Sequence, residues 1–261
     1  MPYFEKRIYS GPILEVERYS ATKGGRPRGS RNTEQPGKDQ EELNSVQSWR
    51  LLFRILNCNF SRDAGDICIT LRFAELVTRA EANREYAAFL RRVRNARQRM
   101  ELDPLRYICV RENQSGREHA HVILNAGIPF AALAQMWKPG TLWYSRLDDT
   151  NNYKELARYL TNQHKPRKGS DSPENAKEPH MKHQRSWTCS RNLQKPIVKK
   201  RPCRPVTLNT MPRAPKGYEL LPEFSRDVDA FGNLFLKWTC RKIPEPNRNR
   251  KPGTLRGRMA C

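Results

Sequence analysis

Two histidines separated by one residue are the side chains of this sequence best suited to chemistry. They lie in the run 117–125 (REHAHVILN), in which an aliphatic stretch follows them. Successive side chains of a β-strand point to opposite faces, so His119 and His121 would share one face, while the apolar residues between and after them face a core. By itself this spacing is a weak sign of a metal site, because two polar residues on the wet face of a half-buried strand give the same pattern.

A carboxylate precedes the histidines at the distance of a hairpin. Glu112 ends the predicted strand 106–112 (RYICVRE), and the turn-forming run 113–116 (NQSG) joins it to the histidine strand. Glu112 would then lie opposite or nearly opposite His119. Two imidazoles and one carboxylate suit a divalent cation that keeps open positions for substrate oxygens. The alternative is an exposed glutamate that pairs with a neighbouring arginine.

A helix predicted over 150–164 offers two tyrosines. At about 100° per residue, Tyr153 belongs to the apolar stripe of this helix, which predicts a core residue, whereas Tyr159 lies off the stripe and can reach into a site. A phenol can attack phosphorus once metal and phosphate are in place. The resulting phosphotyrosine would keep the energy of the phosphodiester for later resealing of the strand. Basic residues around the tyrosines are candidate DNA contacts: Lys154, Arg158 and Lys165.

Further elements must position these side chains. Strict alternation predicts a strand over 67–73 (ICITLRF), and the capping-box pattern at 78–81 opens a helix that runs to about Met100. A hairpin around Gly11 is predicted within residues 1–19. The remaining elements are predicted from their periodicity: helices over 41–59 and 129–137, and strands over 118–125 and 141–146.

Composition points to a polyanionic partner. The 261 residues include 49 Lys and Arg against 27 Asp and Glu, a formal net charge of +22, and nucleic acid is the commonest polyanion that proteins bind. A membrane surface is the competing one, but no run approaches the roughly 20 apolar residues of a spanning helix, and no signal peptide is predicted at the N-terminus. The seven cysteines form no C-x-x-C pair, which indicates a reducing cytoplasm.

Charge and proline content divide the chain into three segments. Residues 1–40 are predicted to form an edge segment and a flexible basic arm, in which Arg26 and Arg28 could follow a phosphate backbone. Residues 41–164 contain the core. Residues 165–261 are predicted to be a basic linker and extension with little independent structure, apart from one hairpin within 228–239. From residue 164 onward there are 23 Lys and Arg against 8 Asp and Glu, and 12 of the 19 prolines.

The order of these motifs resembles the HUH endonuclease superfamily. Strand 67–73 is followed by VRE, then GREHAHVIL, then ARYLTN. Within that superfamily the chain is similar to the rolling-circle replication initiators related to the gene II protein of filamentous phages, which occur in phages, plasmids and integrated elements. The likeness extends over about residues 1–200 and includes the Gly/Arg-rich arm, FLRRVRNAR, WKPG and SWTCSRNLQKP.

The resemblance implies an α+β fold. An RRM-like antiparallel sheet would carry helices packed on one face, followed by the basic, proline-rich C-terminal extension. It also implies that Glu112, His119 and His121 bind Mg²⁺ or Mn²⁺ and that Tyr159, with Tyr153 as a possible second tyrosine, nicks and joins single-stranded DNA at a specific site. The family usually has a lysine three residues after the nucleophile, whereas Asn162 stands here.

The implied product is a covalent 5′-phosphotyrosine link together with a 3′-hydroxyl that primes DNA synthesis. The implied partners are single-stranded or origin DNA and a host helicase and polymerase in the cytoplasm of a bacterial cell, with no membrane. Three other functions fit parts of the sequence: a non-catalytic basic DNA-binding regulator, an HUH relaxase or transposase of a mobile element, and a His-x-His metalloenzyme that acts on small molecules. The last would need more strands and less positive charge.

Overall fold

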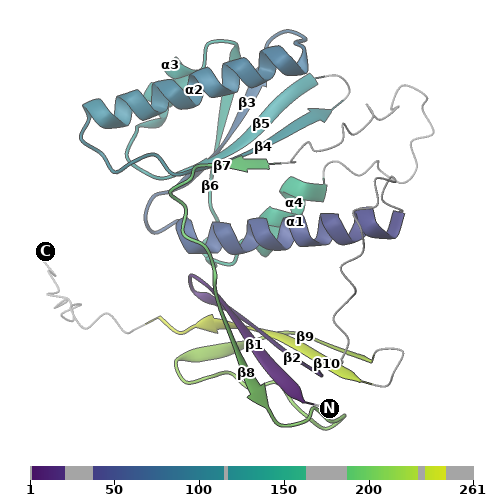
Figure 1. Cartoon of the computed structure of the whole chain (residues 1–261). Coiled ribbons are helices and arrows are strands. Elements are labelled where there is room, and N and C mark those ends of the chain that lie inside the picture. The colour runs from purple at the N-terminus through teal and green to yellow at the C-terminus, as the bar shows by residue number, and fades with distance from the viewer. Residues whose placement is uncertain (1, 21–37, 115–116, 163–186, 229–232, 245–261) are drawn as a thin grey trace, which may run out of the picture. The chain divides into compact units, whose positions relative to one another are not determined.

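The computed structural model describes residues 2–20, 38–114, 117–162, 187–228 and 233–244. The chain divides into two compact units. One unit consists of Met1–Arg7, Leu14–Ala21 and Lys200–Cys261, and the other consists of Ile8–Ile13 and Thr22–Lys199. Each unit has its own five-stranded sheet (Figure 1).

The sheet of the larger unit has the strand order β6-β3-β5-β4-β7, and every neighbouring pair in it is antiparallel. Its strands are β3 (Ile67–Phe73), β4 (Tyr107–Gln114), β5 (Arg117–Leu124), β6 (Gly140–Arg146) and β7 (Trp187–Cys189). The helices of this unit are α1 (Lys38–Asn59), α2 (Arg79–Arg99), α3 (Phe130–Met136) and α4 (Lys154–Asn162). The predicted elements of the core are therefore confirmed, with bounds that shift by a few residues.

Helices cover both faces of this sheet, with α2 and α3 on one side and α1 and α4 on the other (Figure 1). The α+β class is confirmed, but the expectation that helices cover one face does not hold. The reason is that both sets of alternating strand positions are apolar. Ile69, Leu71 and Val122 pack against α2, whereas Cys68, Ile108 and Ile123 pack against α1 and α4.

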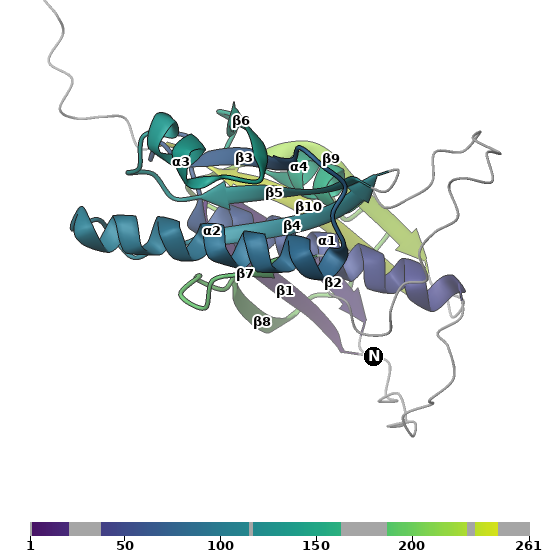
Figure 2. The ribbon, with the colours of Figure 1, turned by 90° about the horizontal axis from the view of Figure 1, so that it is seen from above.

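Helix α2 begins at the predicted capping box. The Thr78 hydroxyl accepts a hydrogen bond from the backbone N–H of Glu81, whose side chain accepts one from the backbone N–H of Thr78. Seen from above, α2 runs nearly along β4 and β5 (Figure 2). Its apolar stripe is buried, and so is Arg97 in its last turn. Arg97 donates hydrogen bonds to the carbonyls of Asp103, Asn125 and Ala126, which fastens the chain on both sides of the β4–β5 hairpin.

The smaller unit combines strands from the two ends of the sequence. Its sheet has the order β8-β1-β2-β10-β9, from β1 (Tyr3–Ser10), β2 (Ile13–Ser20), β8 (Ile197–Cys203), β9 (Tyr218–Val228) and β10 (Leu234–Lys242). The predicted N-terminal hairpin and the hairpin within 228–239 are both present, the second being longer than expected. The division at residues 40 and 164 therefore does not match the units, because pairing between β2 and β10 is a long-range contact that local composition does not reveal.

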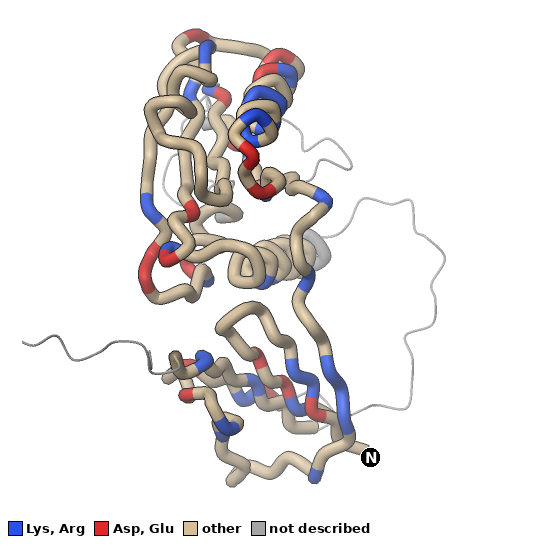
Figure 3. Tube along the Cα trace, turned by 90° about the vertical axis from the view of Figure 1, so that its left-hand side faces the viewer, with Lys and Arg blue, Asp and Glu red and all other residues tan. Residues whose placement is uncertain are grey.

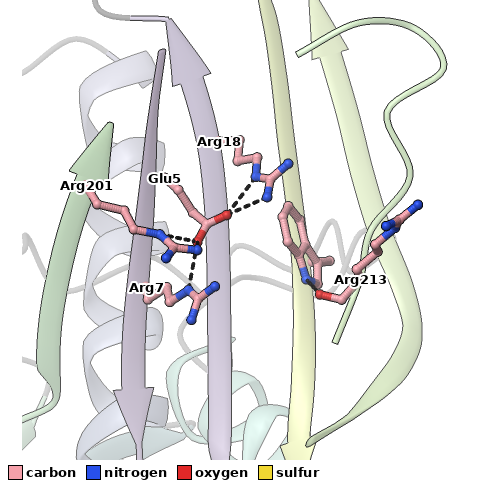
Figure 4. Close-up of polar contacts among 6 residues, drawn as sticks. Glu5, Arg7, Arg18, Arg201 and Arg213 are labelled. Atoms are coloured by element: carbon pink, nitrogen blue, oxygen red, sulfur yellow. Dashed lines mark hydrogen bonds and ion pairs between the residues drawn. The ribbon is translucent and has the colours of Figure 1, made fainter. Parts of the chain in front are cut away.

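A buried carboxylate joins three strands of this smaller sheet. Glu5 of β1 is 1% exposed and accepts hydrogen bonds from Arg7, from Arg18 of β2 and from Arg201 of β8, at 2.7–2.8 Å (Figure 4). Burial alone would raise the pKa of Glu5, but the hydrogen bonds from Arg18 and Arg201 and the charge of Arg7 outweigh it, so the pKa is lowered. In the same sheet Trp238 donates its indole N–H to the carbonyl of Arg213, the residue labelled in Figure 4.

No helix in the described part of the chain is long and apolar enough to cross a membrane. Cys68 and Cys109 are buried within their strands, and burial raises the pKa of each thiol to about 11. Both thiols are therefore neutral and shielded from solvent at physiological pH.

Replacing Glu5 with glutamine should destabilise the smaller unit. The substitution leaves three arginines around a neutral group, and we expect a loss of about 2–3 kcal/mol, slightly below the range for a fully buried pair because the arginines keep some contact with water. Since the pKa of Glu5 is lower in the folded state, its contribution is complete above the pKa of an unfolded glutamate and disappears as the pH falls through the folded value. Urea unfolding at neutral and at acid pH measures both effects.

The matched control is Glu219→Gln, because Glu219 and Arg241 form an exposed ion pair in the same sheet. This variant should change the free energy of unfolding by less than about 1 kcal/mol. Equal losses for the two variants, or a loss for Glu5→Gln that persists at low pH, would contradict the assigned role of Glu5.

Candidate metal centre and nucleophile

Strand register brings the predicted side chains together. In the β4–β5 hairpin Glu112 is paired with His119, as the sequence predicted. On the other side of β5, His119 is paired with Arg72 and His121 with Thr70 of β3. Directly paired residues of antiparallel strands project from the same face, so all five side chains lie on the face that α1 and α4 cover elsewhere.

Glu112, His119 and His121 form one compact cluster. The Nε2 atom of His119 lies 3.0 Å from one carboxylate oxygen of Glu112, and the Nε2 atom of His121 lies 3.8 Å from the other. The ligand atoms of the three residues all lie within 4.8 Å of one another. Ligand atoms that share one ion at about 2.0–2.2 Å are about 3–4 Å apart, so the cluster fits a divalent cation with small adjustments.

The other ring nitrogen of each histidine is also engaged. Thr70 Oγ1 lies 3.0 Å from Nδ1 of His121, and the carbonyl of Arg117 lies 3.4 Å from Nδ1 of His119. These contacts orient both rings so that Nε2 faces Glu112. A group that binds the second nitrogen of a histidine selects the tautomer and holds the ring in position for a metal.

Glu118, which lies between the metal-binding candidates in sequence, has another function. Alternation places it on the α2 side of the sheet, where it is buried and binds the guanidinium of Arg79 through both carboxylate oxygens at 3.0 and 2.9 Å. Asn113 donates to the same carboxylate at 3.2 Å. This pair anchors the start of β5 to the first turn of α2, so it stabilises the strand that carries the histidines.

The two tyrosines of the α4 region have opposite environments. Tyr159 is 56% exposed, and its ring centroid lies 6.0 Å from that of His121, so the structure brings it to the cluster. Tyr153 has no exposed surface and donates its hydroxyl to Asn151 at 3.1 Å. Burial raises the pKa of Tyr153 to about 12. The structure thus places Tyr153 in the core, as its helical position predicted, and not with the candidate site.

Helix α4 is held over the sheet by its apolar stripe. Ala157 and Leu160 are fully buried against α1 and the sheet, and Tyr159 lies off this buried stripe, where its side chain is exposed. Arg158 stacks over the ring of Trp49 of α1 at 5.0 Å and pairs with Glu155 at 3.1 Å. Lys154 opens the same helix.

Several predicted DNA contacts lie outside the described residues, namely Arg26, Arg28 and Lys165, and the same holds for the side chain of Asn162. The sequence did not single out Thr70. Its alternation with Ile69 and Leu71 placed it on the correct face, but only the register of β3 with β5 shows that it meets His121.

Residues 66–164 match the family model of the Replication-associated protein ORF2/G2P. This segment is similar to the ORF2/G2P family. The predicted resemblance to gene II-type replication proteins is thereby confirmed over this range, which runs from β3 to the end of α4 and contains the whole cluster and Tyr159. Searches of the curated proteins and of the solved structures gave no match.

Removing the Thr70 hydroxyl from the ORF2/G2P segment should weaken metal binding. Thr70→Val keeps the shape of the side chain but removes the contact with Nδ1 of His121, and losing such a contact lowers metal affinity about 10–100-fold. Calorimetric titration with Mn²⁺ measures the change. Thr70→Ser, which keeps the hydroxyl, should bind like the wild type, and equal affinity of the valine and serine variants would contradict this role.

Proposed function

We propose that the chain is a rolling-circle replication initiator that nicks and rejoins single-stranded DNA, with Tyr159 as the nucleophile. The observation that carries the proposal is the position of the exposed Tyr159 ring next to His121, which belongs to the Glu112–His119–His121 cluster. The match of residues 66–164 to the ORF2/G2P family model supports a role in replication, and the net charge of +22 supports DNA as the partner.

The Nε2 atoms of His119 and His121 and the carboxylate of Glu112 would hold a divalent cation, with Mg²⁺ or Mn²⁺ as the candidates. Mn²⁺ accepts imidazole nitrogen more readily than Mg²⁺, which prefers oxygen ligands. When bound, such an ion polarises a phosphodiester and stabilises negative charge on its oxygens.

The reaction assigned to Tyr159 is a displacement at phosphorus. Its phenol gives its proton to solvent, which reaches the exposed side chain, and its oxygen forms a bond to the phosphorus. The bond between phosphorus and the 3′-oxygen breaks, and that oxygen takes a proton to become a 3′-hydroxyl. The DNA 5′-phosphate stays bonded to Tyr159. Attack by a 3′-hydroxyl on this link reverses the step and rejoins the strand.

The surroundings of Tyr159 suit a phosphate chain. Arg158 is held by Trp49 and Lys154 lies one turn earlier on the same helix, so two cations accompany the nucleophile along α4. The burial and the raised pKa of Tyr153 support Tyr159 as the single nucleophile. Closing a replicated circle would then use a second copy of the chain or a second reaction cycle at Tyr159.

A covalent adduct tests the proposal. Incubating the full chain with labelled single-stranded DNA from the region flanking its gene and Mn²⁺ should give a protein–DNA adduct on denaturing gels. The adduct should disappear in Tyr159→Phe, because the attacking oxygen is gone, and in the presence of EDTA. Tyr153→Phe is the matched control and should keep the adduct, since it removes only a buried hydroxyl that contacts Asn151.

Binding to DNA without any adduct would contradict nicking and favour a non-catalytic DNA-binding regulator. An adduct that persists in Tyr159→Phe would show that another residue is the nucleophile. The same chemistry serves relaxases and transposases of mobile elements, so mapping the nick on the flanking DNA, at a replication origin or at the end of an element, assigns the biological role.

A further inference from the structure

An exposed tryptophan lies on the same face of the sheet as the candidate site. Trp143 of β6 is 62% exposed, and its register partner on β3 is Thr70, which in turn is the partner of His121 on β5. Trp143, Thr70 and His121 therefore form one row across three strands. Because neighbouring strands are about 4.8 Å apart, the row places Trp143 about 10 Å from His121 at the Cα atoms.

An exposed arginine lies in the adjacent row. Arg72 is the partner of His119 on one side and of Thr141 on the other, so its side chain also projects from this face. In the part of the chain that the structure describes, Arg72 is exposed and no carboxylate pairs with it. The only acidic residue of these two rows is Glu112, which is buried with the histidines.

Neither Trp143 nor Arg72 packs in an apolar core of the fold, so packing does not explain their position. Trp143 belongs to neither apolar core, whereas Trp137 and Trp187 pack within or against one. A large aromatic side chain left in water beside a charged site is a sign of a binding surface. Figure 3 shows Lys and Arg positions along α2, which covers the opposite face of this sheet, so Arg72 is the basic residue that these two rows place beside Trp143.

We infer that Trp143 and Arg72 form a subsite for single-stranded DNA next to the Glu112–His119–His121 cluster. A base stacks on the Trp143 ring, and Arg72 pairs with a neighbouring phosphate. Stacking needs the free face of an unpaired base, so the subsite selects single strands over duplex. This inference rests on the proposed nicking function for its purpose, but it concerns binding and is tested without cleavage.

Fluorescence anisotropy with a short labelled oligo(dT) in EDTA measures this binding on the full chain. Trp143→Ala should weaken binding roughly 5- to 150-fold, the effect of losing one stacked base, and Trp143→Phe should keep most of the affinity. Arg72→Ala should lower the dependence of affinity on salt by about one phosphate contact. Oligo(dT) should also quench tryptophan emission less in Trp143→Phe than in the wild type.

The matched control is Tyr144→Ala. Tyr144 is the next residue of β6 and is 43% exposed, but it projects from the opposite face, where its ring contacts Phe130 at 5.5 Å. The Tyr144→Ala variant should bind oligo(dT) like the wild type. Circular dichroism of each variant establishes that the fold is kept. If the alanine variant does not fold, the smaller quenching of tryptophan emission expected in Trp143→Phe still tests the subsite.

Each other outcome has a definite meaning. Wild-type affinity in Trp143→Ala, or an equal loss in Tyr144→Ala, overturns the subsite. If Trp143→Ala weakens the binding of duplex DNA as much as that of oligo(dT), base stacking on Trp143 is overturned. A wild-type dimer that becomes a monomer in Trp143→Ala assigns this face to self-association instead. If the Tyr159 adduct forms but oligo(dT) affinity does not depend on Trp143, the proposed function is supported and the subsite is overturned. If oligo(dT) affinity depends on Trp143 but no adduct forms, the subsite is supported and the proposed nicking function is overturned.

Discussion

The register of three antiparallel strands is the constraint on which the candidate site depends. Glu112 meets His119, and Thr70 meets His121, only because β4 and β3 pair with β5 at particular positions. Side chains alternate between faces, so a slip of one residue in either pairing would move a member of the cluster to the α2 side. Such a slip is opposed because it would also move Thr70 and Arg72 into the apolar core beneath α2.

The face of the sheet that carries the candidate site has two environments. At one end Cys68, Ile108 and Ile123 are covered by α1 and α4, and at the other end Arg72 and Trp143 are exposed beside the largely buried imidazoles. Packing of α4 against the apolar end fixes where the Tyr159 side chain lies relative to the polar end. The hydrophobic core thus positions Tyr159, the proposed nucleophile, relative to the candidate metal ligands.

Local signals in the sequence predicted much of this arrangement. Alternation in ICITLRF, the capping box at Thr78 and the pairing of Glu112 with His119 in one hairpin each depend on neighbouring residues, and the structure has all three. The opposite environments of Tyr153 and Tyr159 also followed from helical periodicity. These features are determined within one element or one hairpin, which is why a single sequence sufficed for them.

The features that the sequence did not predict are long-range. Nothing near Thr70 or Trp143 indicates that they share a row with His121, because that depends on crossovers through α2 and α3. The pairing of β1 and β2 with β8 and β10 joins the two ends of the chain, and the buried carboxylate of Glu5 at their junction looks like an ordinary surface glutamate in the sequence. Arg97 is likewise a charged residue that is held inside by hydrogen bonds to three carbonyls, two of which belong to residues far from it in the sequence.

The most direct test of the central claim is the position of Mn²⁺ in crystals of the chain, located by anomalous diffraction. The account predicts one strong peak bounded by the Nε2 atoms of His119 and His121 and the carboxylate of Glu112, with the Tyr159 hydroxyl facing it across a gap that a phosphate can fill. A peak at other residues, or a Tyr159 side chain that points away from the ion, would contradict the account.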